Sequence, residues 1–405
     1  MAVPTVDARA LAAEAFADAV SWRRQLHSRP ELSFQERETA RFVEETLASF
    51  GGLEVSRPTK TSVMGRLVGE RSGPVLALRA DIDALPIAEE SGLPFASERA
   101  GVMHACGHDG HTAVLLAVAR VLVGLRDSLG GEARFLFQHA EELLPGGARD
   151  LVAAGALSGV DVVVGCHLIT ILDVGKVAVP SGPFMASPDT FSVVIEGRGG
   201  HAALPNVSVD PIAVAAQVVV SLQHVVSRET DPNERVVITV ARIAGGSADN
   251  IIPESVEFGG TVRTFSPEAR ERARNSIERI VAGVTQAHAA GYRFEYVEGY
   301  LPVDNDPELA ERVAGAAERA LGVDALTEIA PIMGGDDFSA YQREAPGVYF
   351  MVGARSEEAG ATFAHHHPRF TIDERAMENA IAVFIEVARD VLGGSFTPLR
   401  PDARA

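Results

Sequence analysis

The sequence predicts an α/β protein, in which a mostly parallel sheet flanked by helices is interrupted by an inserted α+β domain. The length of 405 residues exceeds the roughly 250–300 residues at which a single core stops growing, so two domains are expected. Short β-rich runs alternate with helical patterns in the first part of the chain and again near its end, and the order changes between them. We therefore predict one domain from residues 1–182 and 301–405 and a second from residues 183–300.

The first domain is expected to be built from βαβ units. Its strands are VLALRA at 75–80, ARFLFQ at 133–138, VDVVVG at 160–165 and GVYFMVG at 347–353. A helix from about His111 to Leu125 carries an apolar stripe that would lie on the sheet, made of Val114, Val118, Val121 and Leu125. An amphipathic helix is expected over 372–392, and the tail 396–405 is expected to be frayed. Strands that alternate with helices are typical of a mostly parallel sheet.

The inserted domain shows a different order of elements. Its strands are expected at 190–197, 235–243, 255–264 and 292–299, and its helices at 211–226 and from Pro267 to about Ala289. This β-α-β-β-α-β order is that of the ferredoxin-like arrangement.

Charge and composition narrow the classes of partner. Lys plus Arg number 36 and Asp plus Glu number 55, which gives a formal net charge of −19. Such a chain repels a phosphate backbone, so we expect no nucleic-acid partner. We also expect no membrane partner, because no run of about 18 apolar residues is present, and the first twenty residues do not resemble a secretion signal. The only cysteines, Cys106 and Cys166, are usual for a reducing compartment, which predicts a cytoplasmic protein.

Donor side chains gather where the predicted strands of the first domain end. In chain order these are Asp81 and Asp83, Glu141 and Glu142, Cys166 and His167, and the HHHP stretch at 365–368. The segment MHACGHDGH directly precedes the helix that carries Val114. In open α/β sheets, ligands bind beyond the carboxyl ends of the strands. We therefore expect these side chains to form one site.

Cys106 and His108 are the first candidates for metal ligands. A lone free cysteine is more often a small buried apolar residue, but a thiolate and an imidazole on one turn can point at a single ion. Together with Glu142, His167 and a histidine of the HHHP stretch, the pair predicts a metal site. This donor set is compatible with Zn, Mn, Co or Ni.

The adjacent pair Glu141 and Glu142 is not explained by simple exposure to solvent. Two adjacent carboxylates after a buried strand repel each other unless cations or protons neutralise them. Alternatively, both interact with the N-terminal dipole of a helix near Gly147 to Leu151. Beside a metal the roles separate, because Glu142 would bind the ion and Glu141 would be free to move a proton.

Five further histidines fall into three groups. His201, in the Gly-rich run GRGGHAALP of the inserted domain, is either an ordinary surface histidine or one that projects into a site. His104 and His139 are expected to orient ligands or to be structural. His27 and His224 lie in helical patterns, which indicate no functional role.

Ten segments along the chain resemble a metallopeptidase family that contains aminoacylases and glutamate carboxypeptidases, and more closely its branch of hippurate hydrolases and indole-acetyl-amino-acid hydrolases. They are LHSRPELSFQERETA, LRADIDALPI, MHACGHDGHTA, FQHAEE, GCHL, GRGGHAALP, ADNIIP, GTVRTF, GGDDFS and HHHPRF. The resemblance implies a zinc-exopeptidase-like catalytic domain and an inserted lid or dimerisation domain. Two positions depart from the branch: His139 replaces the usual Pro, and Asp336 replaces the usual Glu.

The resemblance also assigns roles to individual residues. It implies two divalent metal ions per subunit, bridged by Cys106 and otherwise held by His108, Glu142, His167 and His366. The family motif places the last ligand two residues before Pro368, which selects His366 over His365 and His367. Glu141 matches the general base, and His201 matches a histidine that reaches the site of a neighbouring subunit, so a homodimer or higher homo-oligomer is expected. Asn250 and Arg263 match residues that hold the amide oxygen and the carboxylate of the substrate.

We therefore expect an amidohydrolase that cleaves N-acyl amino acids with a metal-activated water and Glu141 as general base and acid. One rival is an exopeptidase or dipeptidase of the same family. A second, from another class, is a metal-dependent binding protein without turnover. A third is a hydrolase in which Cys106 is the nucleophile.

Overall fold

The computed structural model describes residues 7–394 and 396, so most of the tail that was expected to be frayed lies outside the described residues. The chain forms two compact units. The first contains the chain up to Gly182, Asp304–Ala330 and the part from Asp337 onward, and the second contains Pro183–Val303 and Pro331–Asp336. That the first unit is catalytic and the second serves as a lid or dimerisation domain stays a prediction.

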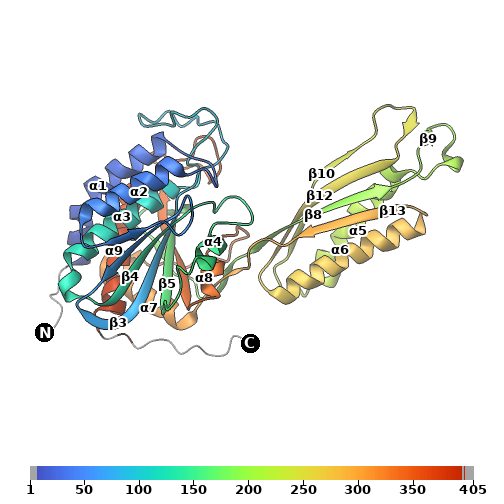
Figure 1. Cartoon of the computed structure of the whole chain (residues 1–405). Coiled ribbons are helices and arrows are strands. Elements are labelled where there is room, and N and C mark those ends of the chain that lie inside the picture. The colour runs from blue at the N-terminus through green and yellow to red at the C-terminus, as the bar shows by residue number, and fades with distance from the viewer. Residues whose placement is uncertain (1–6, 395, 397–405) are drawn as a thin grey trace. The chain divides into compact units, whose positions relative to one another are not determined.

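The first unit is built on a seven-stranded mixed sheet (Figure 1). Its strand order is β1 (Glu54–Ser56), β2 (Val63–Val68), β4 (Gly130–Gln138), β3 (Arg71–Asp81), β5 (Val162–Asp173), β15 (Gly347–Arg355) and β6 (Val177–Ala178). The four predicted strands, β4, β3, β5 and β15, lie together in the middle and are parallel, whereas the outer strands pair antiparallel. The carboxyl ends of these four strands therefore meet at one edge of the sheet.

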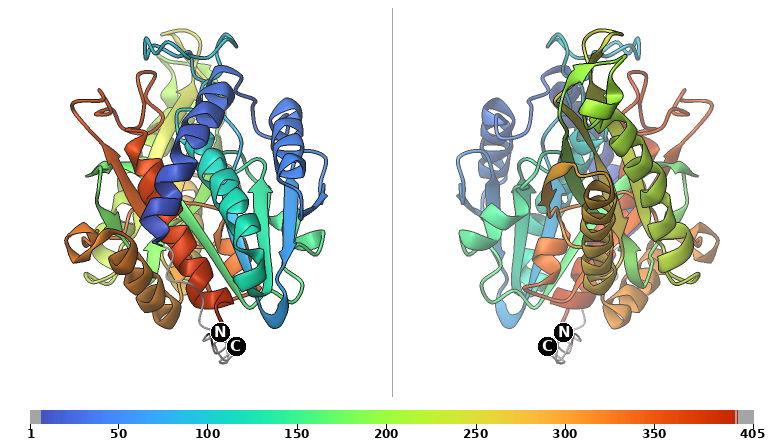
Figure 2. Two further views of the ribbon diagram at one scale, coloured as in Figure 1. Left: turned by 90° about the vertical axis from the view of Figure 1, so that its left-hand side faces the viewer. Right: turned by 90° about the vertical axis from the view of Figure 1, so that its right-hand side faces the viewer.

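Helices cover both faces of this sheet. The helices of the first unit are α1 (Ala8–Ser28), α2 (Arg37–Phe50), α3 (His108–Gly124), α4 (Ala148–Ala153), α7 (Pro307–Leu321), α8 (Ser339–Gln342) and α9 (Arg375–Leu392). The blue, blue-green and red helices α1, α3 and α9 pack side by side on one face (Figure 2), while α4 and α8 lie on the other (Figure 1). Helix α3 is buried over most of its length, which agrees with its nearly continuous apolar sequence.

The second unit has the predicted β-α-β-β-α-β order. Its sheet runs β10 (Val237–Gly245), β12 (Ser255–Thr264), β8 (Ser187–Glu196) and β13 (Gly291–Val297), with all neighbours antiparallel. Helices α5 (Pro211–His224) and α6 (Pro267–Ala287) pack against it and share a core of their own. The ferredoxin-like prediction is therefore confirmed for this unit.

Among residues 7–394 and 396, no helix has the length and apolar character that crossing a membrane requires.

Candidate metal centre

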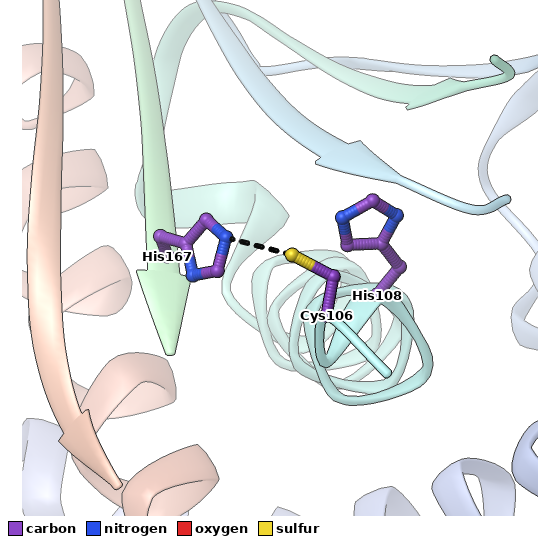
Figure 3. A group of neighbouring side chains, drawn as sticks. All are labelled: Cys106, His108 and His167. Atoms are coloured by element: carbon purple, nitrogen blue, oxygen red, sulfur yellow. Dashed lines mark hydrogen bonds between the residues drawn. The ribbon is translucent and has the colours of Figure 1, made fainter. Parts of the chain in front are cut away.

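Cys106 and His108 lie at the start of α3, where the chain turns sharply. Gly107, between them, has a φ of +86°, in the left-handed region that favours glycine. The turn brings both side chains close to His167 of β5 (Figure 3). One ligand atom from each of the three residues lies within 4.8 Å of the others, and Cys106 Sγ is 3.5 Å from His167 Nε2.

Cys106 also belongs to a second group of candidate ligands, with Glu142 and His366. Glu142 Oε1 lies 3.2 Å from His366 Nε2 and 3.9 Å from His108 Nε2. The structure thus brings the five predicted metal ligands into two groups that share a thiol. A ligand that bridges two ions must belong to both groups, as Cys106 does.

Hydrogen bonds orient two of the imidazoles toward this cluster. His108 Nδ1 lies 3.0 Å from the Asp83 carbonyl oxygen and 3.2 Å from Asp83 Oδ1. His167 Nδ1 lies 3.0 Å from the Leu168 carbonyl oxygen. Because these oxygens can only accept, each Nδ1 carries the proton when the ring is neutral, and each Nε2 keeps a lone pair for an ion.

The electrostatics of the cluster favour a bound cation. Burial and the charges of Glu142 and Glu141 raise the pKa of the Cys106 thiol well above its usual value. Burial opposes a charge on His108, but Asp81, Asp83 and Glu142 outweigh it and raise the pKa of His108 to about 10. Glu142 Oε1 is buried and accepts no hydrogen bond among the described residues. A thiol, imidazoles and carboxylates with unmet negative charge fit divalent metal ions.

Glu141 lies beside the donor groups and is only 7% exposed. One of its oxygens is within 4.8 Å of ligand atoms of His108 and Glu142. Ala140, directly before it, has a φ of +50°, a conformation that residues with a Cβ rarely adopt. Its carbonyl oxygen accepts a hydrogen bond of 3.0 Å from Gly147 N. This turn presents both glutamates to the cluster.

His365 also approaches Cys106, with Nδ1 at 3.7 Å from Sγ. Its Nε2 accepts a hydrogen bond of 3.3 Å from Thr170 N, and burial with nearby histidines lowers the pKa of His365 to about 3. His367 stacks on Phe363 instead. Of the three histidines, His366 is the one that shares a candidate ligand group with Glu142.

A chain of contacts behind the cluster supports His167. His111 Nδ1 lies 2.6 Å from Asp81 Oδ1, and His111 Nε2 accepts a hydrogen bond of 2.9 Å from Leu168 N. Arg79 is fully buried and forms an ion pair of 2.6 Å with Asp81. The sequence indicated the strand-end position of Asp81, but not its role as an anchor for His111.

Several supporting residues were not predicted. His27, which the helical pattern left without a role, is buried and lies 2.8 Å from Asp109 Oδ2, with Nδ1 facing the carboxylate. Arg23 Nε donates to the same oxygen at 3.0 Å. Although burial opposes ionisation, Arg23 and His27 hold the pKa of Asp109 well below its usual value. His27 and Asp109 are 82 residues apart along the chain, so no local pattern pointed to their contact.

His104 and His139, predicted to orient ligands or to be structural, are both buried. His139 Nε2 lies 3.4 Å from Asp150 Oδ2. Neither ring nitrogen of His104 has a hydrogen-bond partner among the described residues, and burial lowers the pKa of His104 to about 4. Neither residue bonds to a candidate ligand in the contacts described.

His201, predicted to be catalytic, and Asn250 and Arg263, predicted to bind substrate, belong to the second unit. His201 is exposed on β9 (Gly200–His201), which pairs with β11 (Ile251–Ile252). Ala202 N donates to the Asn250 carbonyl oxygen at 3.0 Å, so His201 and Asn250 are close in space. Arg263 is half-buried on β12, and burial lowers its pKa.

Comparisons with a family profile, with related sequences and with solved structures all point to the same family. The profile described as Peptidase family M20/M25/M40 matches residues 77–390. The chain is 55% identical over 304 residues to an N-acyl-L-amino acid amidohydrolase of Geobacillus stearothermophilus, covering 75% of this chain and 82% of the relative. It is 38% identical over 360 residues to thermostable carboxypeptidase 2 of Saccharolobus solfataricus, covering 88% and 91%. A Bacillus subtilis crystal structure, described as a dinuclear metal binding peptidase from the M20 family, matches with a TM-score of 0.82 and 38% identity, covering 94% and 99%.

Proposed function

Because the chain belongs to peptidase family M20/M25/M40 and is a hydrolase of that family, we propose that it hydrolyses the amide bond of N-acyl amino acids with two divalent ions. The observation that carries this proposal is the position of Cys106, which is common to the groups completed by His108 and His167 and by Glu142 and His366. The similarity to an N-acyl-L-amino acid amidohydrolase supports the substrate class. Zn, Mn, Co and Ni all suit this donor set.

Glu141 is the proposed general base and acid. Two ions in this site would lower the pKa of a water molecule and polarise an amide carbonyl. Glu141 is close to the donor groups but absent from the proposed ligand set, so its carboxylate can take a proton from that water and return it to the leaving amine. Its burial shields this transfer from bulk solvent.

The second unit is proposed to bind the remaining parts of the substrate. Arg263 has a planar guanidinium that suits the carboxylate of the amino-acid product. Asn250 would hold the amide oxygen, and His201 would stabilise the negative charge that develops on it. The closeness of His201 and Asn250 within their unit supports a shared task.

A homodimer in the cytoplasm is proposed as the form of the protein. In the second unit, β10 is an edge strand of the sheet, and Ile243 on it is 58% exposed. Val220 on the neighbouring α5 is 66% exposed. Unpaired edges and exposed apolar side chains are typical of contact surfaces. Both cysteines are free thiols, as expected in a reducing compartment.

The decisive experiment is an activity assay after removal and return of metal. Protein treated with a chelator and reloaded with one metal at a time should hydrolyse N-acetyl and N-benzoyl amino acids, and should lose that activity again on chelation. A preference for dipeptides with a free amine would instead favour the peptidase alternative, which the similarity to a carboxypeptidase supports. Activity that survives chelation but not thiol alkylation would indicate a Cys106 nucleophile. Metal binding without turnover of either substrate class would indicate a binding protein.

A further inference from the structure

Residues 33–36, in the loop before α2, contribute two side chains that contact the supports of the metal cluster. Ser33 Oγ donates to Asp83 Oδ2 at 2.6 Å, and Asp83 in turn holds His108. Glu36 Oε1 accepts hydrogen bonds from Phe34 N at 2.9 Å and from Ala140 N at 2.8 Å. One short loop is therefore bonded to the supports of both His108 and the two glutamates.

The hydrogen bond between Ala140 N and Glu36 holds a residue whose backbone conformation is unfavourable. Ala140 has a φ of +50°, which is disfavoured for a residue with a Cβ. Its N–H donates to Glu36, and its carbonyl accepts from Gly147. Because Glu141 and Glu142 follow directly, the conformation of Ala140 determines where their carboxylates point.

Stability alone does not explain a glutamate at this position. Glu36 is fully buried, and its Oε2 has no hydrogen-bond partner among residues 7–394 and 396. Burying a carboxyl with an unpartnered oxygen destabilises a fold relative to an apolar side chain of similar size. The hydrogen bond to Ala140 N therefore explains why a glutamate occupies this position, whereas packing alone does not.

We propose that Glu36 is a positioning residue, whose carboxyl holds the Ala140 turn so that Glu141 is directed at the scissile amide. The inference rests on the proposed function of Glu141. Glu36 itself touches neither substrate nor ion; it acts through the backbone of Ala140. Burial raises the pKa of Glu36 to about 7, but Oε1 can accept in either protonation state, so a glutamine can make the same two bonds.

The test compares Glu36→Gln with Glu36→Met in metal-loaded, full-length protein. Methionine fills a similar volume and accepts no strong hydrogen bond, so we expect kcat to fall at least tenfold with KM within about threefold in protein that still folds. Glu36→Gln should retain most of kcat. Gln35→Met, a neighbouring exposed position, should leave kcat and KM unchanged.

Hydrogen exchange at the Ala140 amide provides a readout that does not depend on the substrate. The amide should exchange at least tenfold faster in Glu36→Met than in Glu36→Gln or the parent. Unchanged exchange in Glu36→Met, a parental kcat in that variant, or equal loss of kcat in both variants would overturn the proposal. If the proposed function is wrong, the parent protein itself will not cleave N-acyl amino acids, and the exchange result will still decide the role of Glu36.

Discussion

Cys106 is the side chain on which the proposed two-ion site most depends, because it belongs to both donor groups. Cys106→Ala should therefore lose most bound metal together with activity, while the fold persists because the change in buried volume is small. Metal content measured by mass spectrometry and thermal unfolding would check this. Cys166→Ala is a matched control, since Cys166 is also buried and free but lies in neither group. Full metal content in Cys106→Ala would remove Cys106 from the ligand set.

Glu141 and Glu142 are neighbours with different proposed tasks. Glu141→Gln should keep both ions and lower kcat by about 10²–10⁴-fold, the usual range for loss of a general acid or base. Glu142→Gln should instead lose metal, because Glu142 shares a candidate ligand group with Cys106 and His366, and a neutral amide is a weaker ligand for a divalent ion than a carboxylate. Steady-state kinetics and metal content of the two variants would separate the roles. The opposite pattern would mean that the two roles are exchanged.

Glu36 should make the stability of the protein depend on pH. Burial raises its pKa to about 7 from an ordinary value of 4.5. A raised folded-state pKa gives a stabilising contribution that is present below the unfolded pKa and is lost as pH rises through the folded pKa. Glu36→Gln cannot titrate at this position. The free energy of unfolding of this variant should therefore rise relative to that of the parent as pH increases from about 4.5 to 7, by about 1.4 kcal/mol for each pH unit.

Urea unfolding of chelator-treated protein at several pH values would measure this gain. Glu38→Gln is a suitable control, because Glu38 is exposed and solvent screens its charge. A difference between Glu36→Gln and the parent that stays constant with pH would contradict the raised pKa.

At the scale of elements, the first half of β5 packs closely against aromatic rings at Gly165. A Cβ on Gly165 would lie 2.9 Å from a ring carbon of Tyr349 and 3.0 Å from one of Phe338, and these two rings are stacked. Gly165→Ala should therefore destabilise the protein by about 1–3 kcal/mol. It should also weaken metal binding, because His167 lies two residues further along the strand. Thermal unfolding and metal titration would measure both effects.

Gly124→Ala is the control for this prediction. A Cβ on Gly124, at the end of α3, meets no atom within 4 Å, and alanine favours a helix over glycine by roughly 0.5–1 kcal/mol. This variant should be neutral or slightly more stable and should bind metal normally. Equal destabilisation of both variants would show that the space beside Gly165 is not the cause.

The strands that carry the candidate site could be predicted from the sequence, because each apolar run ends in polar donors, but their order in the sheet could not. The parallel arrangement of β4, β3, β5 and β15 follows from the alternation with helices. The boundaries of β5 did not follow: it continues to Asp173 rather than ending near residue 165. The reason is pairing with β15, which extends through residues 166–169 and beyond. His167 therefore lies within a strand and not in a loop after it.

The supporting residues were harder to predict than the donors. Ser33 and Glu36 lie in a loop without strand or helix periodicity, and their partners are about 50 and 104 residues away along the chain. Only the three-dimensional fold brings them together. Donor types such as cysteine and histidine are rare and chemically specific, whereas a serine or glutamate in a loop has many ordinary explanations.

At the scale of the whole molecule, the proposed reaction draws on both units. The candidate metal ligands lie in the first unit, and His201, Asn250 and Arg263 lie in the second. His201 is exposed within its own unit. If it acts on the site of a neighbouring subunit, as the family resemblance implies, then His201→Ala protein should be nearly inactive although its ions are bound.

Mixing two inactive variants tests this arrangement. A mixed dimer of His201→Ala and Glu141→Gln subunits would contain one site with Glu141 from one chain and His201 from the other. Random exchange of equal amounts makes half of the dimers mixed, and each has one complete site of two, so activity should return to roughly a quarter of the parental value. Subunit exchange must be verified with differently tagged chains. A mixed dimer supplies Glu141 from one chain and His201 from the other. If mixed dimers form and activity stays absent, His201 therefore acts within its own chain or has no catalytic role.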